Sequence, residues 1–229
     1  MKLALFDLDN TLLSGDTDVE WLDFLVERGV LPASEGAANH AMDRRYGSGK
    51  ASPLEYVRFY LSYYRPYDLA TLRAWRADFF ERRIRPLMLP AAGALIDSHR
   101  KSLIAIVTAT NRFLVEPIAA AFGIEHLMAT EPQIADGRFT GDIVAEPCMR
   151  EGKVAHLARW LGARGHTLED FGESWFYSDS INDLPLLERV THPVAVDPGE
   201  KLEALARSRG WPRITLRAAP AARGGPSPT

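Results

Sequence analysis

The strongest constraint on the fold is a set of short apolar segments that alternate with stretches of helical periodicity. The clearest are residues 3–6 (Leu-Ala-Leu-Phe) and residues 103–107 (Leu-Ile-Ala-Ile-Val). Uninterrupted apolar runs of this length are typical of strands buried on both faces of a parallel sheet. Further strands are expected at 127–129, 175–177, 193–196 and 214–216, with helices at 91–101, 112–122, 151–164, 182–189 and 198–208. This alternation predicts a doubly wound parallel α/β sheet.

Residues 16–88 have a different pattern, which predicts helices only. Apolar residues recur at helical spacing from Val19 to Val26 and stop at Gly29. Ser52-Pro53-Leu54-Glu55 combines a capping Ser, a Pro in the first turn and a Glu three residues on, which indicates a helix start. Helices are also expected at 34–46, 53–64 and 68–84.

These patterns divide the chain into three parts. We expect residues 1–15 and 89–217 to form one α/β domain, with residues 16–88 as a helical domain inserted into it. Within the α/β part, Asp136-Gly137 lies between two short strand-like runs and predicts a β-hairpin. Residues 218–229 are rich in Pro, Ala, Gly and Arg, and are expected to be a disordered tail.

Composition narrows the class of protein. The 229 residues carry a net charge of −3, whereas a general nucleic-acid binder normally shows a basic excess. Cys148 is the only cysteine, which excludes an intrachain disulfide and a thiolate zinc cluster. The chain has no apolar run of roughly eighteen residues, and its N-terminus reads as a strand rather than a signal peptide. We therefore expect a cytoplasmic protein without membrane or nucleic-acid partners.

Polar side chains follow three of the predicted strands at the point where each strand ends. Asp7 and Asp9 come directly after residues 3–6, Thr108 follows residues 103–107, and Asp179 follows residues 175–177. The carboxyl ends of parallel strands lie at one edge of a sheet, where ligands bind, so these side chains should converge. Two carboxylates so close require a cation or a shared proton, and oxygen-rich sites suit Mg²⁺.

Each of these residues also has an ordinary structural explanation when it is taken alone. Asp7 and Asp9 can form a polar turn, and Thr108 can cap a helix. Lys153 can be a solvated surface lysine, and Asp179 and Asp183 can be an N-cap and a first-turn acid. Their order along the chain is what points to chemistry, because phosphoryl transfer needs a nucleophile, a proton donor and cations at one place.

The ordered set resembles the four motifs of the haloacid dehalogenase (HAD) superfamily. The motifs are Asp7-Leu8-Asp9-Asn10-Thr11, then Thr108, then Lys153 in Glu151-Gly152-Lys153-Val154, then Ser178-Asp179-Ser180-Ile181-Asn182-Asp183-Leu184-Pro185. The resemblance covers about residues 1–15 and 89–200. It implies a Rossmann-like core and hydrolysis of a phosphate monoester.

The resemblance also implies a role for each motif residue. Asp7 would be the nucleophile that forms an aspartyl-phosphate, and Asp9 the general acid and base. Thr108 and Lys153 would contact the phosphoryl group. Mg²⁺ would be held by Asp7, the Asp9 backbone carbonyl and Asp179, with Asp183 as a support through water. Thr11, Ala109 and Asn182 belong to the same motifs and are expected at the substrate site.

The helical insertion between the first two motifs is similar to a C1-type cap, and the subfamily it resembles most is the phosphoserine phosphatase-like group. There, an acid after the first motif holds the substrate amino group and a cap arginine holds its carboxylate. Asp16 and Arg58 fall at comparable positions, although a helix-terminal acid and a surface charge explain them equally well. Thr108-Ala109-Thr110 replaces the usual Ser-Gly-Gly, and Asp16 replaces Glu, so histidinol phosphate is a second candidate substrate beside phosphoserine.

Two other functions share parts of this chemistry. A phosphotransferase or mutase would form the same aspartyl-phosphate and differ only in the acceptor. A phospho-receiver domain also uses Asp, Thr, Lys and Mg²⁺, but it lacks a helical cap and an acid like Asp9. The expected function is thus a Mg²⁺-dependent phosphatase, with its substrate and oligomeric state left open.

Overall fold

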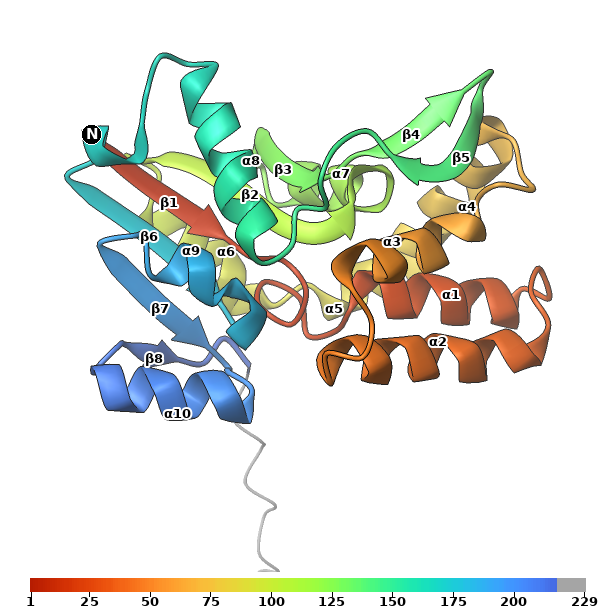
Figure 1. Cartoon of the computed structure of the whole chain (residues 1–229), viewed down its shortest axis with the longest axis horizontal. Helices are drawn as coiled ribbons and strands as arrows, with labels where there is room; N and C mark the ends of the chain where they lie inside the picture. The colour runs from red at the N-terminus through yellow and green to blue at the C-terminus, as the bar shows by residue number, and fades with distance from the viewer. Residues whose placement is uncertain (218–229) are drawn as a thin grey trace, which may run out of the picture.

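The computed structural model describes residues 1–217 and contains a six-stranded parallel sheet, in the order β3-β2-β1-β6-β7-β8 (Figure 1). The expected tail lies outside the described residues. The strands are β1 (Lys2–Phe6), β2 (Leu103–Asn111), β3 (His126–Thr130), β6 (Glu173–Ser178), β7 (His192–Val196) and β8 (Arg213–Ile214). This confirms the predicted doubly wound α/β fold.

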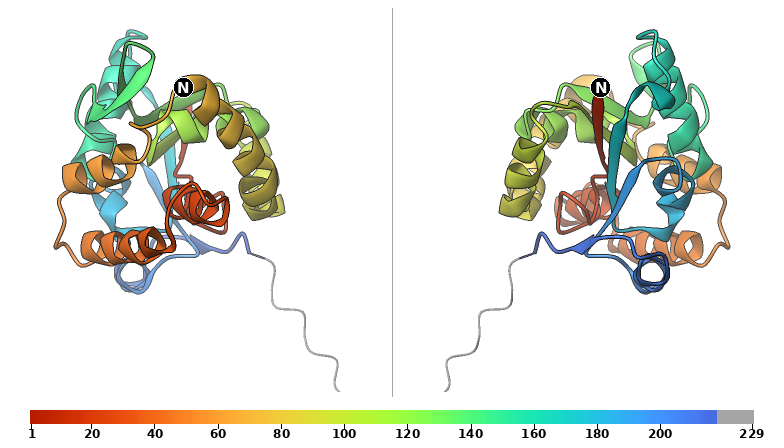
Figure 2. Two further views of the ribbon diagram at one scale, coloured as in Figure 1. Left: turned by 90° about the vertical axis from the view of Figure 1, so that its right-hand side faces the viewer. Right: turned by 90° about the vertical axis from the view of Figure 1, so that its left-hand side faces the viewer.

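Helices cover both faces of the sheet (Figure 2). Ala4 and Phe6 of β1 pack in one core cluster, while Leu3 and Leu5 pack in another, and all four are fully buried. Successive strand residues point to opposite faces, so a continuous apolar run is what a strand between two helix layers requires. The helices are α6 (Pro90–Ser98) and α7 (Arg112–Ala121) on one face, and α8 (Glu151–Gly162), α9 (Leu184–Leu187) and α10 (Glu200–Arg209) on the other.

Residues 17–87, here called the helical insert, form five helices and one π-helical turn. Ser52 and Glu55 form the expected capping box, and Trp21 packs on Tyr64 and Phe79 with ring centroids 6.0 and 5.1 Å away. The elements are α1 (Thr17–Glu27), α2 (Ala33–Gly47), α3 (Pro53–Ser62), α4 (Leu69–Phe79), the π turn Phe80–Ile84 and α5 (Arg85–Leu87).

The chain enters and leaves the insert at adjacent points. Leu13 and Met88 form an antiparallel bridge, the Ser14 amide donates to the Leu87 carbonyl at 2.9 Å, and the Leu89 amide donates to the Leu12 carbonyl at 3.1 Å. The first crossing comes shortly after β1, and the second, which follows α5, is hydrogen-bonded to it. The insert therefore lies beyond the carboxyl edge of the sheet, toward which the β1 arrow points (Figure 1).

Three local predictions need comment. The hairpin of β4 (Pro132–Ala135) and β5 (Arg138–Ile143) is present, with positive φ at Asp136 and Gly137 as a two-residue turn requires. The helix expected at 182–189 is instead a 3₁₀ turn, Ile181–Asp183, followed by the short α9. The last strand ends at Ile214 because the Asp197 carboxylate accepts hydrogen bonds from Thr215 and Leu216.

None of the helices in residues 1–217 is long and apolar enough to cross a membrane.

Candidate active site

A cavity of about 540 Å³ lies at the carboxyl edge of the sheet and is lined by residues of both the sheet side and the helical insert. The chain segments that converge on it are far apart in the sequence, as expected for the ends of parallel strands. Most of the predicted site residues line it: Asp7, Asp9, Asp16, Thr108, Ala109, Lys153, Asp179, Asn182 and Asp183. Thr11 and Arg58 do not line the cavity, for different structural reasons given below.

Lys153 joins two carboxylates at the centre of the site. Its Nζ lies 2.7 Å from Asp7 Oδ1 and 2.7 Å from Asp183 Oδ2, and the lysine side chain is only 3% exposed. Burial opposes the charge of Lys153, but the two carboxylates outweigh it and hold the lysine pKa above its usual value. Burial also raises the pKa of Asp183, to about 6, although Lys153 opposes the rise. The explanation of Lys153 as a solvated surface residue is therefore excluded.

Thr11 is fully buried, and its hydroxyl group contacts two of the cavity acids, Asp7 and Asp179. Its hydroxyl lies 3.3 Å from Asp7 Oδ2 and 3.2 Å from Asp179 Oδ1, and it accepts the Asp179 amide hydrogen at 3.1 Å. Burial raises the pKa of Asp179 to about 8, and the charges of Asp7 and Asp183 add to this rise. Thr11 thus orients the acids rather than lining the cavity.

The charges at this edge of the sheet fit a divalent cation. The charges of Asp7 and Asp183 raise the pKa of Asp179, the charge of Asp7 raises that of Asp183, and Lys153 opposes both rises. Among residues 1–217, no three Asp, Glu, His or Cys side chains converge as a complete metal site. A Mg²⁺ ion would therefore take few protein ligands and complete its shell with water, backbone and phosphate oxygens, as Mg²⁺ commonly does.

Asp9 is held by hydroxyl groups from both parts of the molecule. Its Oδ1 accepts hydrogen bonds from the Thr17 amide, at 2.8 Å, and the Thr17 hydroxyl, while Oδ2 accepts one from the Thr110 hydroxyl at 2.7 Å. Thr17 begins α1 of the insert, and Thr110 belongs to β2. Burial raises the pKa of Asp9 and these hydrogen bonds oppose the rise. A carboxyl group with a raised pKa can carry a proton for a leaving group.

Thr108 is not a helix cap. It lies inside β2, and the side chain of Asn111 caps α7 instead, by accepting the Leu114 amide hydrogen at 3.2 Å. Thr108 is buried, and its hydroxyl oxygen accepts the Thr110 amide hydrogen at 3.2 Å. The hydroxyl hydrogen of Thr108 is thereby left for a group in the cavity that it lines.

The insert and the residue that precedes it, Asp16, contribute acids to the cavity. Asp16 caps α1 through a 3.0 Å hydrogen bond from the Val19 amide, and it also lines the cavity, so both explanations of this residue hold. Burial raises the pKa of Asp16 to about 8, and the charge of Asp9 adds to this. Asp18 and Asp43 line the same cavity, and burial raises the pKa of Asp18 well above its usual value. Asp18 and Asp43 were not predicted as site residues, since acids in helices are common.

The expectation for Arg58 is corrected by the structure. Its guanidinium forms two hydrogen bonds to Asp142 of β5, at 3.1 and 3.2 Å, and both side chains are about half exposed (52% and 46%). Arg58 lies outside the cavity because α3 presents it to the hairpin. Arg44 and Arg150 are the arginines that line the cavity, and neither was anticipated from the sequence.

Comparison with known proteins agrees with this geometry. Residues 4–188 match the model of the haloacid dehalogenase-like hydrolase family. The chain is 36% identical to a histidinol-phosphatase of Neisseria meningitidis, over 94% of this chain and 99% of that protein. It is 31% identical to a phosphoserine phosphatase of Mycobacterium tuberculosis, over 91% of this chain and 68% of that protein.

Solved structures share the fold. A protein of unknown function from Bordetella pertussis has a TM-score of 0.90 at 43% identity, with 94% of this chain and 99% of that one covered. A phosphoserine phosphatase, solved as an analogue of its phospho-aspartyl intermediate, has a TM-score of 0.67 at 20% identity over 94% and 93% of the two chains. The chain belongs to the haloacid dehalogenase-like hydrolase family. Within it, the chain is a phosphatase that hydrolyses phosphoric monoesters.

Proposed function

We propose that this phosphatase depends on Mg²⁺ and works through an aspartyl-phosphate on Asp7. The observation that carries the proposal is the buried Asp7–Lys153–Asp183 arrangement, with both distances at 2.7 Å. Burial raises the pKa of Asp7, and Lys153 opposes this rise and so favours the ionised carboxylate. Lys153 also adds positive charge where the phosphoryl group must bind. The oxygen of Asp7 nearer Thr11 has only a long hydrogen bond, at 3.3 Å, and is the freer of the two to attack.

The reaction then has two proton-balanced steps. Asp7 attacks phosphorus, the ester P–O bond breaks, and protonated Asp9 gives its proton to the leaving oxygen. The Asp9 carboxylate then accepts a proton from water, the water oxygen attacks phosphorus, and phosphate leaves from Asp7. Thr108 donates to the phosphoryl group, and Ala109 and Asn182 border it. Mg²⁺ held by Asp7 and Asp179, with the Asp9 carbonyl and with Asp183 behind, would offset phosphate charge.

The helical insert would act as a cap over this chemistry. Thr17 of the insert binds the carboxylate of Asp9, and the chain passes between the insert and the sheet domain at two adjacent points, Leu13 and Met88. A cap that closes on the cavity excludes bulk water and keeps the leaving group in place. In this proposal residues 16–88 are the cap and residues 1–15 and 89–217 are the core, the boundaries predicted from the sequence.

Removal of the metal gives a direct test. We expect EDTA to lower phosphate release from p-nitrophenyl phosphate at least about 100-fold, since a divalent ion contributes several kcal/mol to charge stabilisation. Mg²⁺ should restore the activity. Ca²⁺ should not, because it prefers more ligands and can draw both Asp7 oxygens away from phosphorus. Full activity in EDTA, after prior dialysis against the chelator, would contradict the proposed cofactor.

For the substrate, we propose a small phosphate monoester whose leaving group carries a positive charge, with histidinol phosphate first and phosphoserine second. Asp16, Asp18 and Asp43 give the insert side of the cavity an acidic character. Arg58, the expected partner of a substrate carboxylate, is engaged by Asp142 outside the cavity. The histidinol-phosphatase of Neisseria meningitidis supports the order, because it aligns over nearly the whole of both chains.

Asp16 provides the second test. Asp16→Asn should lower kcat/KM for histidinol phosphate about 10- to 100-fold, since a charge-assisted contact to the substrate ammonium is lost. The loss should be much smaller for p-nitrophenyl phosphate, which has no cation. Arg58→Ala is the matched control, and both substrates should be turned over as in the wild type. An equal loss on both substrates in Asp16→Asn would mean that Asp16 serves the chemistry or the fold instead.

A further inference from the structure

Arg150 has features that its position before a helix does not explain. Its backbone has φ 52° and ψ −121°, a conformation that residues with a side chain rarely adopt. Its Nε is buried and has no hydrogen-bond partner among the residues that the structure describes. A strained backbone and an unpaired buried donor both cost free energy, and such features concentrate at functional sites.

The loop that carries Arg150 is tightly fixed. The Met149 amide donates to the Pro147 carbonyl at 2.8 Å, and the Gly152 amide donates to the Met149 carbonyl at 2.8 Å. A Cβ atom on Gly152 would lie 2.0 Å from the Pro147 oxygen, so only glycine fits there. Arg150 precedes α8 and Lys153 lies in its first turn, directly after this tight loop, and both line the same cavity. The backbone of Arg150 is therefore held in place rather than free to relax.

The guanidinium of Arg150 lies on the helical insert. It stacks over the ring of Tyr46 in α2, 5.2 Å from the ring centroid, and Tyr46 packs in turn on Tyr56 of α3 at 4.6 Å. Within residues 1–217, Arg150 forms no ion pair with a carboxylate. The positive charge of Arg150 is thus positioned at the boundary of sheet and insert by an aromatic ring, and no protein anion neutralises it.

We propose that Arg150 binds the phosphoryl group of the substrate and joins it to the insert through Tyr46, a role that rests on the proposed phosphatase function. A phosphate dianion adds two negative charges to a site that already holds Asp7, Asp179 and Asp183 against Lys153. An arginine is suited to phosphate because its planar fork can donate two hydrogen bonds to it. Binding of phosphate would give the Nε of Arg150 a hydrogen-bond partner, and it would hold Tyr46 and the insert over the cavity.

Inhibition by inorganic phosphate tests this role, because phosphate has no leaving group. Arg150→Ala should raise the inhibition constant of phosphate about 10- to 100-fold, and should lower kcat/KM for p-nitrophenyl phosphate similarly. Arg150→Lys, which keeps the charge but loses the planar fork, should lie between Arg150→Ala and the wild type. Tyr46→Leu should raise the constant about 3- to 10-fold, since it removes only the stacking surface.

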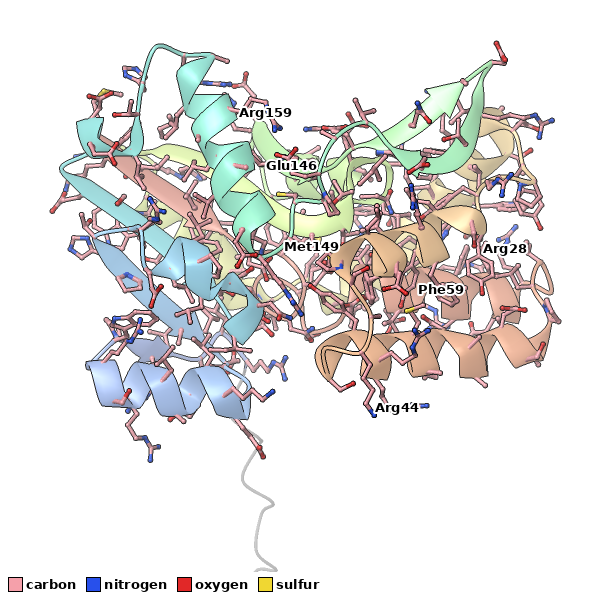
Figure 3. All side chains as sticks on the ribbon, viewed as in Figure 1. Arg28, Arg44, Phe59, Glu146, Met149 and Arg159 are labelled. Atoms are coloured by element: carbon pink, nitrogen blue, oxygen red, sulfur yellow. The ribbon has the colours of Figure 1, made fainter. Side chains whose placement is uncertain are left out.

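Melting temperature separates binding from a structural role. Without phosphate, Arg150→Ala should melt at or above the wild-type temperature, because an unpaired buried donor is removed. The rise that phosphate causes in the wild type should be largely lost in the variant. Arg159→Ala is the matched control: Arg159 lies farther along α8, paired with Glu146, whereas Met149 lies at the N-terminal end near the insert (Figure 3). This control should keep the wild-type inhibition constant.

Two results would overturn the inference. If Arg150→Ala leaves phosphate inhibition unchanged and loses only substrates with an anionic leaving group, Arg150 binds the leaving group. If its melting temperature falls without phosphate while the phosphate-dependent rise persists, Arg150 is structural. The phosphate-dependent rise in melting temperature does not depend on turnover, so failure of the proposed function, seen as a wild type without phosphate release, is distinguishable from failure of this inference.

Discussion

Asp7→Asn is expected to abolish phosphate release while the fold stays intact. The amide fills the same volume as the carboxylate, but it cannot attack phosphorus, so kcat should fall at least about 10⁴-fold. The fold should tolerate the change because Lys153 keeps its second partner, Asp183, at 2.7 Å. Loss of the Asp7 charge also removes one of the causes that raise the pKa of Asp179, so repulsion at the site decreases.

The measurement combines phosphate release from p-nitrophenyl phosphate with far-ultraviolet circular dichroism and a melting curve. A normal spectrum with no turnover is the expected pair of results. Trapping of radiolabelled phosphate on the wild type after an acid quench, and its absence from Asp7→Asn, would identify the covalent step. Substantial turnover by Asp7→Asn would exclude Asp7 as the nucleophile, whatever its spectrum shows.

The convergence of the site could be predicted because it follows from topology. Residues that end parallel strands must lie at one edge, so Asp7, Thr108 and Asp179 could be brought together without any knowledge of side-chain packing. The parallel order itself followed from apolar runs such as Leu3 to Phe6, which only a sheet covered on both faces can bury. Which residues meet at this edge depends on the direction of each strand, and the sequence pattern predicts that direction.

Substrate contacts could not be predicted in the same way because they depend on the rotation of individual helices and loops. Arg58 lies on a helix whose apolar pattern fixes the buried side but not the neighbour that an exposed arginine meets, which is Asp142. Arg150 lines the cavity because its backbone has a positive φ and because the turn that holds it packs tightly at Gly152. Gly152 was visible in the sequence as part of a motif, but its close contact with Pro147 depends on tertiary structure.

The helices of the insert show an intermediate case. The helix expected at 68–84 is longer in the structure, since the chain remains helical through the π turn Phe80–Ile84 to Leu87. Pro86 has no amide hydrogen to donate, and an irregular turn next to a proline is a common way for a helix to continue. Apolar periodicity predicted the helix correctly. The length of the helix depends on how Phe79 and Ile84 pack in the core.

Lys153→Met should produce the largest loss of stability. The substitution leaves the buried carboxylates of Asp7 and Asp183 without their shared cation, and breaking one partner of a buried ion pair typically costs about 3–5 kcal/mol. Phosphate release should be lost as well, because the nucleophile is then protonated and the phosphoryl group has lost a positive charge. The methionine side chain is similar in length, so the change removes charge rather than volume.

The stability loss in Lys153→Met should grow as pH rises, because Asp7 and Asp183 ionise. Burial already raises the pKa of Asp183 to about 6 with Lys153 present, and removal of the lysine charge raises the folded-state pKa values of Asp7 and Asp183 further. An acid whose pKa is higher in the folded than in the unfolded state stabilises the fold at low pH, and this contribution is lost as pH rises through the folded value. The variant should therefore be close to the wild type at pH 5 and much less stable at pH 8.

Urea unfolding in EDTA at the two pH values measures this difference without a contribution from bound metal. Lys50→Met is the matched control, since Lys50 is an exposed lysine of the insert, and its stability should stay within about 0.5 kcal/mol of the wild type at both pH values. Lys153→Arg keeps the charge and should regain part of the stability at pH 8. A loss in Lys153→Met that is equal at pH 5 and pH 8 would mean that packing, rather than the charge shared by Asp7 and Asp183, makes this lysine necessary.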